Sequence, residues 1–147
     1  MHMPARRGPA EWLIAACGVW QIGLGLYFIF LRPTLLPEDV RYVGADLQSL
    51  QAAAPRLADW LGKVFTVMGG FMAGAGVLIA FFGWTVMPTR PRWTTPVLVL
   101  VGTSTLVLMS EVNFALHSDF RWLLVMPPIA WAAAVVAYAL QSRRRKP

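Results

Sequence analysis

Four long stretches without a charged side chain constrain this chain more than any other feature of its sequence. Residues 12–31, 64–87, 93–110 and 122–141 contain no Asp, Glu, Lys or Arg. A bilayer core of about 30 Å is crossed by about 20 mostly apolar residues in a helix. Lipid offers the backbone no hydrogen-bond partner, so each stretch must be a helix or a strand of a closed barrel. The stretches are continuously apolar rather than alternating, which favours helices.

The sequence therefore predicts an all-α membrane protein built as a four-transmembrane-helix bundle. Only 14% of its 147 residues are charged, whereas a soluble domain has about a quarter. We expect spans over about 11–31, 57–86, 93–116 and 119–141, with an outer loop at 32–56. Little of the chain is left for a soluble part, so residues 1–147 are interpreted as a single integral membrane domain.

Basic residues are distributed unequally on the two sides of these spans. The side with both termini has eight basic residues and one acid, and the other has five basic residues and six acids. The two sides thus carry +7 and −1 of the net charge of +6. Basic residues beside short loops stay in the cytoplasm, so we expect both termini there, in a bacterial inner (plasma) membrane. The basic tail is explained by topology, and no nucleic-acid partner is expected.

The loop at 32–56 shows signals for two short interfacial helices. Pro37 followed by two acids is typical of a first helical turn, and Gly44 is suited to end that helix. Asp46 is placed to cap a second helix over residues 47–53. Beyond the loop, Asp59 and Lys63 are four residues apart on the second span and are expected to pair.

Two features predict how the spans pack. Gly70 and Gly74 have the small-residue spacing that lets helices approach closely. We interpret the pair as packing inside the bundle, with a homo-oligomer or a membrane-protein partner on that face as the alternative. Pro127 and Pro128 interrupt the fourth span, so the carbonyls of Leu123 and Leu124 are expected to lose their helical partners.

The two outer connections supply most of the candidate site. Glu111 lies about one turn inside the end of the third span, where an acid is costly unless it is paired or hydrated. We expect Arg41 or Arg121 to pair with it. Glu111 and His117 are the candidate catalytic groups, since a carboxyl and an imidazole can transfer protons. The candidate ligand-binding residues of this face are Glu38, Asp39, Arg41, Asn113, Asp119 and Arg121. The alternative, that these groups only fasten the loop to the helix ends, remains open.

A second group of polar residues lies at mid-depth. Gln21 and Trp20 are near the centre of the first span, and Trp131 is near the centre of the fourth. They are interpreted either as packing contacts or as the walls of a pocket for a lipid-like molecule. In the packing interpretation, Gln21 binds Thr66, the 103–105 hydroxyl cluster or Trp131.

The sequence excludes several kinds of chemistry. A single cysteine, Cys17, allows no disulfide within the chain. No zinc-ligand spacing, phosphate-binding glycine loop or nucleophile elbow is present, so no metal and no cofactor are expected. The first span has Gln21 at the depth where small multidrug exporters carry a carboxylate, and this counts against proton-coupled export.

Three functions remain, and whether the protein is an enzyme stays open. The first is binding or conversion of a small lipidic or hydrophobic molecule at the outer face. The second is a non-enzymatic accessory subunit of a larger membrane complex. The third is a small transporter, which would need a polar path that the neutral mid-depth residues do not provide. The clustering of polar groups on one face favours the first.

Overall fold

The computed structural model describes residues 8–144, and this part of the chain contains helices and no strand. Four helical segments are long and apolar enough to cross a membrane: Pro9–Phe30, Leu57–Thr89, Thr94–Ala115 and Arg121–Ser142. They match the predicted spans to within a few residues. The prediction of an all-α, four-helix membrane bundle is confirmed.

The first span is a single helix, and each of the other three consists of two or three helical segments. The first span is α1 (Pro9–Phe30), and the loop carries α2 (Pro37–Val43) and α3 (Leu47–Ala53). The second is α4 (Leu57–Phe81), followed by the π-helical η1 (Phe82–Val86) and the 3-10 turn η2 (Met87–Thr89). The third is α5 (Thr94–Gly102), the π-helical η3 (Thr103–Val107) and α6 (Leu108–Ala115). The fourth is α7 (Arg121–Leu124) and α8 (Met126–Arg144).

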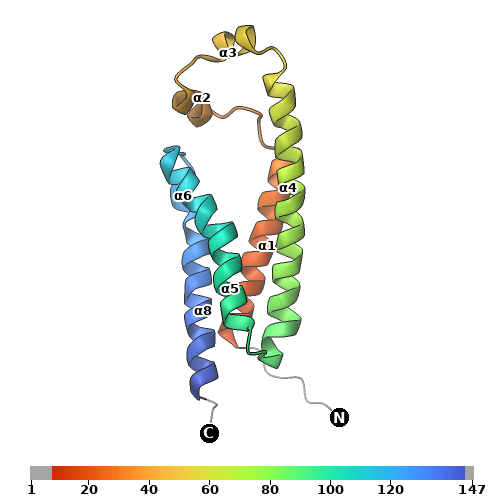
Figure 1. The fold of residues 1–147 in the computed structure, drawn as a ribbon, viewed down its shortest axis with the longest axis vertical. Helices are drawn as coiled ribbons and strands as arrows, with labels where there is room; N and C mark the ends of the chain where they lie inside the picture. The colour runs from red at the N-terminus through yellow and green to blue at the C-terminus, as the bar shows by residue number, and fades with distance from the viewer. Residues whose placement is uncertain (1–7, 145–147) are drawn as a thin grey trace.

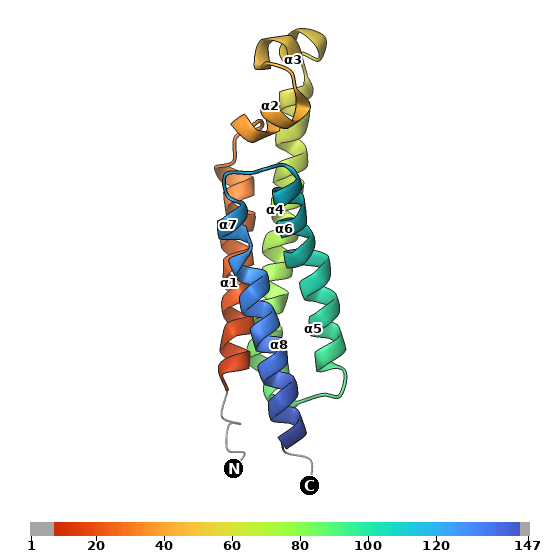
Figure 2. The ribbon, with the colours of Figure 1, turned by 90° about the vertical axis from the view of Figure 1, so that its left-hand side faces the viewer.

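The four spans form two groups that meet along α1. Helix α1 packs against α4 on one side and against α8 on another, and α8 packs against α5 (Figures 1 and 2). The start of α1 and the end of α8 lie at one end of the molecule, and α2 and α3 lie at the other (Figure 1), which is the end that the charge distribution predicts to be the outer one. Helix α4 continues past the end of α1 at the outer end, so one side of its first turns faces the loop.

Glycines bring α1 and α4 into backbone contact. A Cβ atom added at Gly18 would lie 2.5 Å from the backbone nitrogen of Ala80, and one at Gly25 would lie 2.5 Å from that of Ala73. On the facing helix, a Cβ atom added at Gly76 would lie 2.7 Å from the carbonyl oxygen of Gly18, and one at Gly69 would lie 2.6 Å from that of Gly25. Between lipid-embedded helices, such close packing replaces the hydrophobic effect as the source of association.

Gly70 and Gly74, the glycine pair expected to pack within the bundle, do not pack there. Gly70 and Gly74 are exposed, and a Cβ atom at either position would meet nothing within 4 Å. Neighbouring residues of a helix point about 100° apart, so the packing face that contains Gly69 leaves Gly70 outside it. The GxxxG face therefore lies on the outside of this chain.

The loop helices follow the local signals. Helix α2 begins at Pro37 and ends at Gly44, whose φ of 73° is a left-handed conformation that suits glycine. Asp46 accepts hydrogen bonds from the hydroxyl of Ser49 at 2.6 Å and from its backbone N–H at 2.9 Å. These bonds lower the pKa of Asp46 below its ordinary value.

The proline break in the fourth span is accommodated by neighbouring side chains. Helix α7 ends at Leu124, and its carbonyl accepts a hydrogen bond from the buried hydroxyl of Ser110 at 2.7 Å. The thiol of Cys17 lies 3.8 Å from the carbonyl of Pro127. The prediction that the prolines free a carbonyl that needs a partner is confirmed at Leu124.

A matched pair of substitutions tests the backbone contact. We expect Gly25→Ala to lower the free energy of unfolding by about 1–3 kcal/mol, because its methyl group overlaps the backbone of α4. Gly23→Ala is the control on the same helix, since it meets nothing within 4 Å. Denaturation in mixed micelles, followed by circular dichroism, measures both. Equal stability of the two variants would contradict the contact.

Candidate functional site

The two outer connections are joined by a buried and an exposed contact. Glu38 on α2 is only 4% exposed, and its Oε1 accepts a hydrogen bond from the hydroxyl of Ser118 at 3.1 Å. Arg41, one turn further, forms an ion pair with Asp119 at 3.1 Å, and both of these side chains are largely exposed. These contacts fasten α2 over the connection between α6 and α7. The exposed ion pair contributes about 0–1 kcal/mol to stability, so the buried hydrogen bond holds α2 more strongly.

A second set of contacts holds the start of the loop against the end of α1. Asp39 accepts hydrogen bonds from the guanidinium of Arg32 at 3.1 Å and from the backbone N–H of Leu36 at 2.9 Å. The guanidinium of Arg32 lies 3.7 Å from the ring centroid of Phe65 on α4, a cation–π contact. Sequence reasoning did not identify Arg32. The feature that could have indicated Arg32 is its position as the first charged residue after the first apolar stretch.

The expected partner of Glu111 is engaged elsewhere. Arg41 binds Asp119, and Arg121 donates a hydrogen bond to the carbonyl of Ser118 at 3.3 Å. Within residues 8–144, the exposed side chain of Glu111 has no hydrogen bond and no ion pair. The expectation that an arginine pairs with Glu111 is therefore wrong. The acid faces outward from α6, about one turn from its end.

His117 lies two residues beyond the end of the third span at Ala115. It has a left-handed φ of 50°, and the backbone N–H of Ser118 donates to the carbonyl of Asn113 at 2.9 Å. This geometry closes the helix C-terminus, and histidine tolerates it better than branched residues do. The amide of Asn113 donates to the carbonyl of Met109 at 2.8 Å. The imidazole of His117 is exposed.

The mid-depth residues do not form the hydrogen bonds expected from the sequence. The indole of Trp131 donates to the carbonyl of Leu98 on α5 at 2.9 Å, next to Gly102. Thr66 and Thr105 donate to carbonyls of their own helices. Within the described residues, the buried Oε1 of Gln21 has no hydrogen-bond partner. Trp20 is 37% exposed, and Trp131 is buried between α8 and α5.

A buried charged network at the opposite end was missed by sequence reasoning. The side chain of Glu11 is 2% exposed, and its carboxylate accepts from the backbone N–H of Gly8 and lies 3.8 Å from Arg90. Arg90, with a left-handed φ of 54°, also donates to Gln141 at 2.9 Å and Ser142 at 3.0 Å. The network ties α1, the turn after η2 and the end of α8 together. Glu11 and Arg90 looked like isolated topology charges because they are far apart in sequence.

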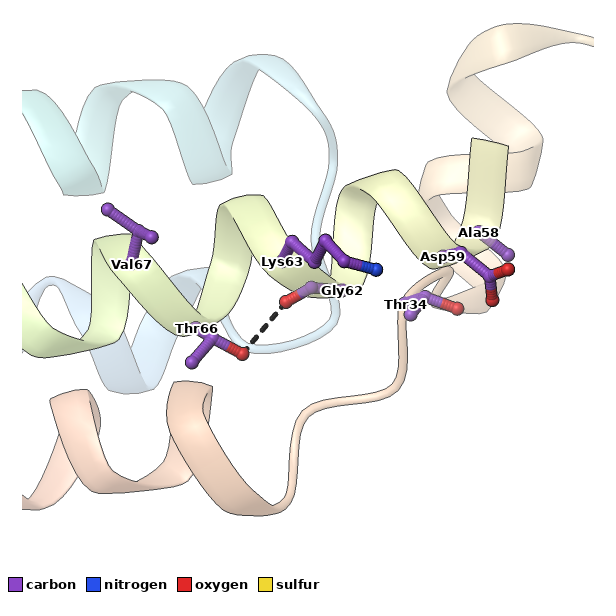
Figure 3. Close-up of a pocket in the computed structure, with 7 residues that line it drawn as sticks. All are labelled: Thr34, Ala58, Asp59, Gly62, Lys63, Thr66 and Val67. Carbon is purple, nitrogen blue, oxygen red and sulfur yellow. Dashed lines mark hydrogen bonds between the residues drawn. The ribbon is translucent and has the colours of Figure 1, made fainter. Parts of the chain in front are cut away.

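An open groove lies on the outer half of α4. It has a volume of about 560 Å³ and is lined by Thr34, Ala58, Asp59, Gly62, Lys63, Thr66 and Val67 (Figure 3). Thr34 comes from the segment after α1 and the other residues from successive turns of α4. In Figure 3 the ammonium of Lys63 points toward the end of α4 that carries Asp59. The floor is at Gly62, where a Cβ atom would lie 3.2 Å from the methyl of Thr34.

The comparisons leave the site to be judged on its own geometry. No family model, no curated protein and no solved structure matches this chain. Within residues 8–144, no group of three or more His, Cys, Asp or Glu residues is placed to hold a metal ion. Of the outer candidates, Arg41 and Asp119 pair with each other, whereas Glu38, Asp39, Asn113 and Arg121 bond to residues outside the candidate set. The groove has the charged residues Asp59 and Lys63 toward its outer end and Val67 toward its inner end, an arrangement suited to an amphipathic molecule.

The buried contact of Glu38 should hold α2 in place. We expect Glu38→Ala to speed backbone amide exchange in residues 37–43 at least about fivefold, because the fastening to Ser118 is lost. Arg41→Ala, which removes the exposed pair, should change it far less. Hydrogen–deuterium exchange with mass spectrometry measures both variants. An equal effect of the two would contradict the greater strength assigned to the buried bond.

The buried network at the other end should contribute to stability. Glu11→Gln keeps an acceptor for Gly8 but removes the charge facing Arg90, so we expect a loss of about 1–3 kcal/mol in unfolding free energy. Arg92→Gln, an exposed charge in the same turn, should stay within about 0.5 kcal/mol of the wild type. A Glu11→Gln protein as stable as Arg92→Gln would show that the network is dispensable.

Proposed function

We propose that this multi-pass protein binds a small lipid-like molecule at the outer face of a bacterial inner (plasma) membrane, through the groove on α4. The observation that carries the proposal is the groove itself. Its mouth has one acid and one base, Asp59 and Lys63, and its inner end has Val67. An amphipathic ligand needs this order of polar mouth and apolar wall.

The contacts that hold the outer loop support the proposal because they define one wall of the groove. Arg32 holds Asp39 and lies over Phe65 on α4, and this directs the following segment across α4. Thr34 is thereby placed over Gly62. A segment fixed by an ion pair keeps the groove formed without ligand, which lowers the ordering cost of binding.

Glu111 and His117 are proposed as the groups that would act on a ligand if the protein is an enzyme. Both are exposed at the outer end of the third span, and neither side chain has a hydrogen bond within the described residues. A carboxyl and an imidazole free of structural partners are suited to proton transfer.

The alternative function is an accessory subunit of a larger membrane complex. The observation that favours it is the exposed Gly70/Gly74 face, beside which Phe71 is 78% exposed. Small residues on a lipid-facing helix admit a partner helix at close range. A transporter is the weaker alternative, because the described polar groups at mid-depth are neutral.

Filling the groove should abolish ligand binding. We expect native mass spectrometry, after release from nanodiscs of host lipids, to show an adduct of defined mass on the wild type. Gly62→Leu should lower its abundance about tenfold, since the side chain occupies the floor of the groove. Gly23→Leu is the control, because that position is open. Glu111→Gln and His117→Ala, examined in parallel, should keep the adduct, because neither residue lines the groove.

Two outcomes would contradict the proposal. One is an adduct that survives Gly62→Leu unchanged, or no adduct at all. The other is a protein partner held at fixed ratio and lost in Gly74→Leu, which would favour the accessory subunit.

A further inference from the structure

The groove residues occur along α4 in a definite chemical order. From the outer end inward, the helix presents the carboxylate of Asp59, the ammonium of Lys63, the hydroxyl of Thr66 and the methyl groups of Val67. Asp59, Lys63 and Val67 follow one another at intervals of four residues, and Thr66 comes three residues after Lys63, so all four lie on one side of the helix. The groove therefore changes from negative to positive to neutral polar to apolar within about two turns.

The depth of the groove matches the lipid headgroup region. Lys63 is the last charge before the apolar stretch 64–87, and Arg32 is the first charge after the stretch 12–31. The cation–π contact of Arg32 with Phe65 places these two boundaries at the same level. Cations at the ends of spans reach toward phosphates at that level. Asp59 then lies one turn further out, and Val67 lies one turn further in.

The two charges at the mouth are available to a ligand. Asp59 and Lys63 were expected to pair with each other, but they form no ion pair within residues 8–144, so that expectation is wrong. The hydroxyl of Thr66 donates to the carbonyl of Gly62 at 2.9 Å. It retains its lone pairs as acceptors.

We propose that the groove binds the headgroup of a phosphatidylethanolamine-type glycerophospholipid. The lipid ammonium lies against Asp59, the phosphate against Lys63, the glycerol ester region beside Thr66 and Thr34, and an acyl chain along Val67. Such a lipid carries its amine outermost and its phosphate one step deeper, which is the complement in sign of the order along α4. This inference rests on the proposed function, because it assigns the ligand class of the same groove.

The lining distinguishes a primary amine from a quaternary one. A choline headgroup is bound by aromatic faces, and none of the lining residues is aromatic. A primary ammonium instead donates charge-assisted hydrogen bonds to a carboxylate, as Asp59 offers. A phosphatidylglycerol headgroup would offer Asp59 neutral hydroxyls in place of a cation, which removes the ion pair. The groove thus favours the ethanolamine lipid over both others.

Competition between lipids tests the assignment. Wild-type protein is placed in nanodiscs with equal amounts of phosphatidylethanolamine, phosphatidylcholine and phosphatidylglycerol of the same acyl chains, and the adducts are counted by native mass spectrometry. We expect the ethanolamine lipid to be enriched about fivefold over the other two. Asp59→Asn should abolish the preference over choline, and Lys63→Gln should lower all phospholipid adducts. Arg56→Gln, an exposed charge outside the groove, is the control and should change neither.

The outcomes separate this inference from the proposed function. Equal binding of the three lipids, with adducts still lost in Gly62→Leu, would overturn the headgroup assignment and leave the amphiphile site in place. A preference that survives Asp59→Asn would also overturn the assignment. Adducts that do not depend on Gly62 would overturn both.

Discussion

The backbone contact between α1 and α4 determines the rest of this structure. Gly18 and Gly25 on one helix meet Gly76 and Gly69 on the other so closely that a methyl group would overlap main-chain atoms. In lipid, where apolar burial between helices contributes little, such a contact fixes the register of the pair. That register places Arg32 over Phe65 and Thr34 over Gly62. The groove on α4 is therefore a consequence of where these glycines lie.

Local chemistry made much of this fold predictable from the sequence. Charge-free stretches give the spans, and the limits of α2 follow from the fixed φ of Pro37 and the left-handed φ of Gly44. What could not be predicted depends on which helix faces which. Gly70 and Gly74 have the spacing of a packing pair but lie on a face that does not contact α1, because spacing alone does not give the rotation of a helix.

At the candidate site too, local features could be predicted from the sequence, and the contacts between distant residues could not. The sequence indicated that acids and arginines gather at the outer end, and the structure brings Glu38 to Ser118 and Arg41 to Asp119. It did not indicate which groups would be engaged with one another. Glu11 looked like a topology charge and is buried, because a distant turn brings Arg90 to it. Lys63 looked like one half of a helical pair and faces an open groove.

The most direct test of the central claim is a solid-state NMR distance between the side chain of Lys63 and lipid phosphorus. The chain contains two lysines, Lys63 and Lys146, so ¹⁵N-lysine labelling of a Lys146→Arg variant leaves one labelled ammonium. In bilayers containing phosphatidylethanolamine, the groove account predicts strong ¹⁵N–³¹P dephasing, as for direct ammonium–phosphate contact, and its loss in Gly62→Leu. A Lys63 signal with no phosphorus dephasing, or with dephasing unchanged by Gly62→Leu, would contradict a lipid bound in the groove.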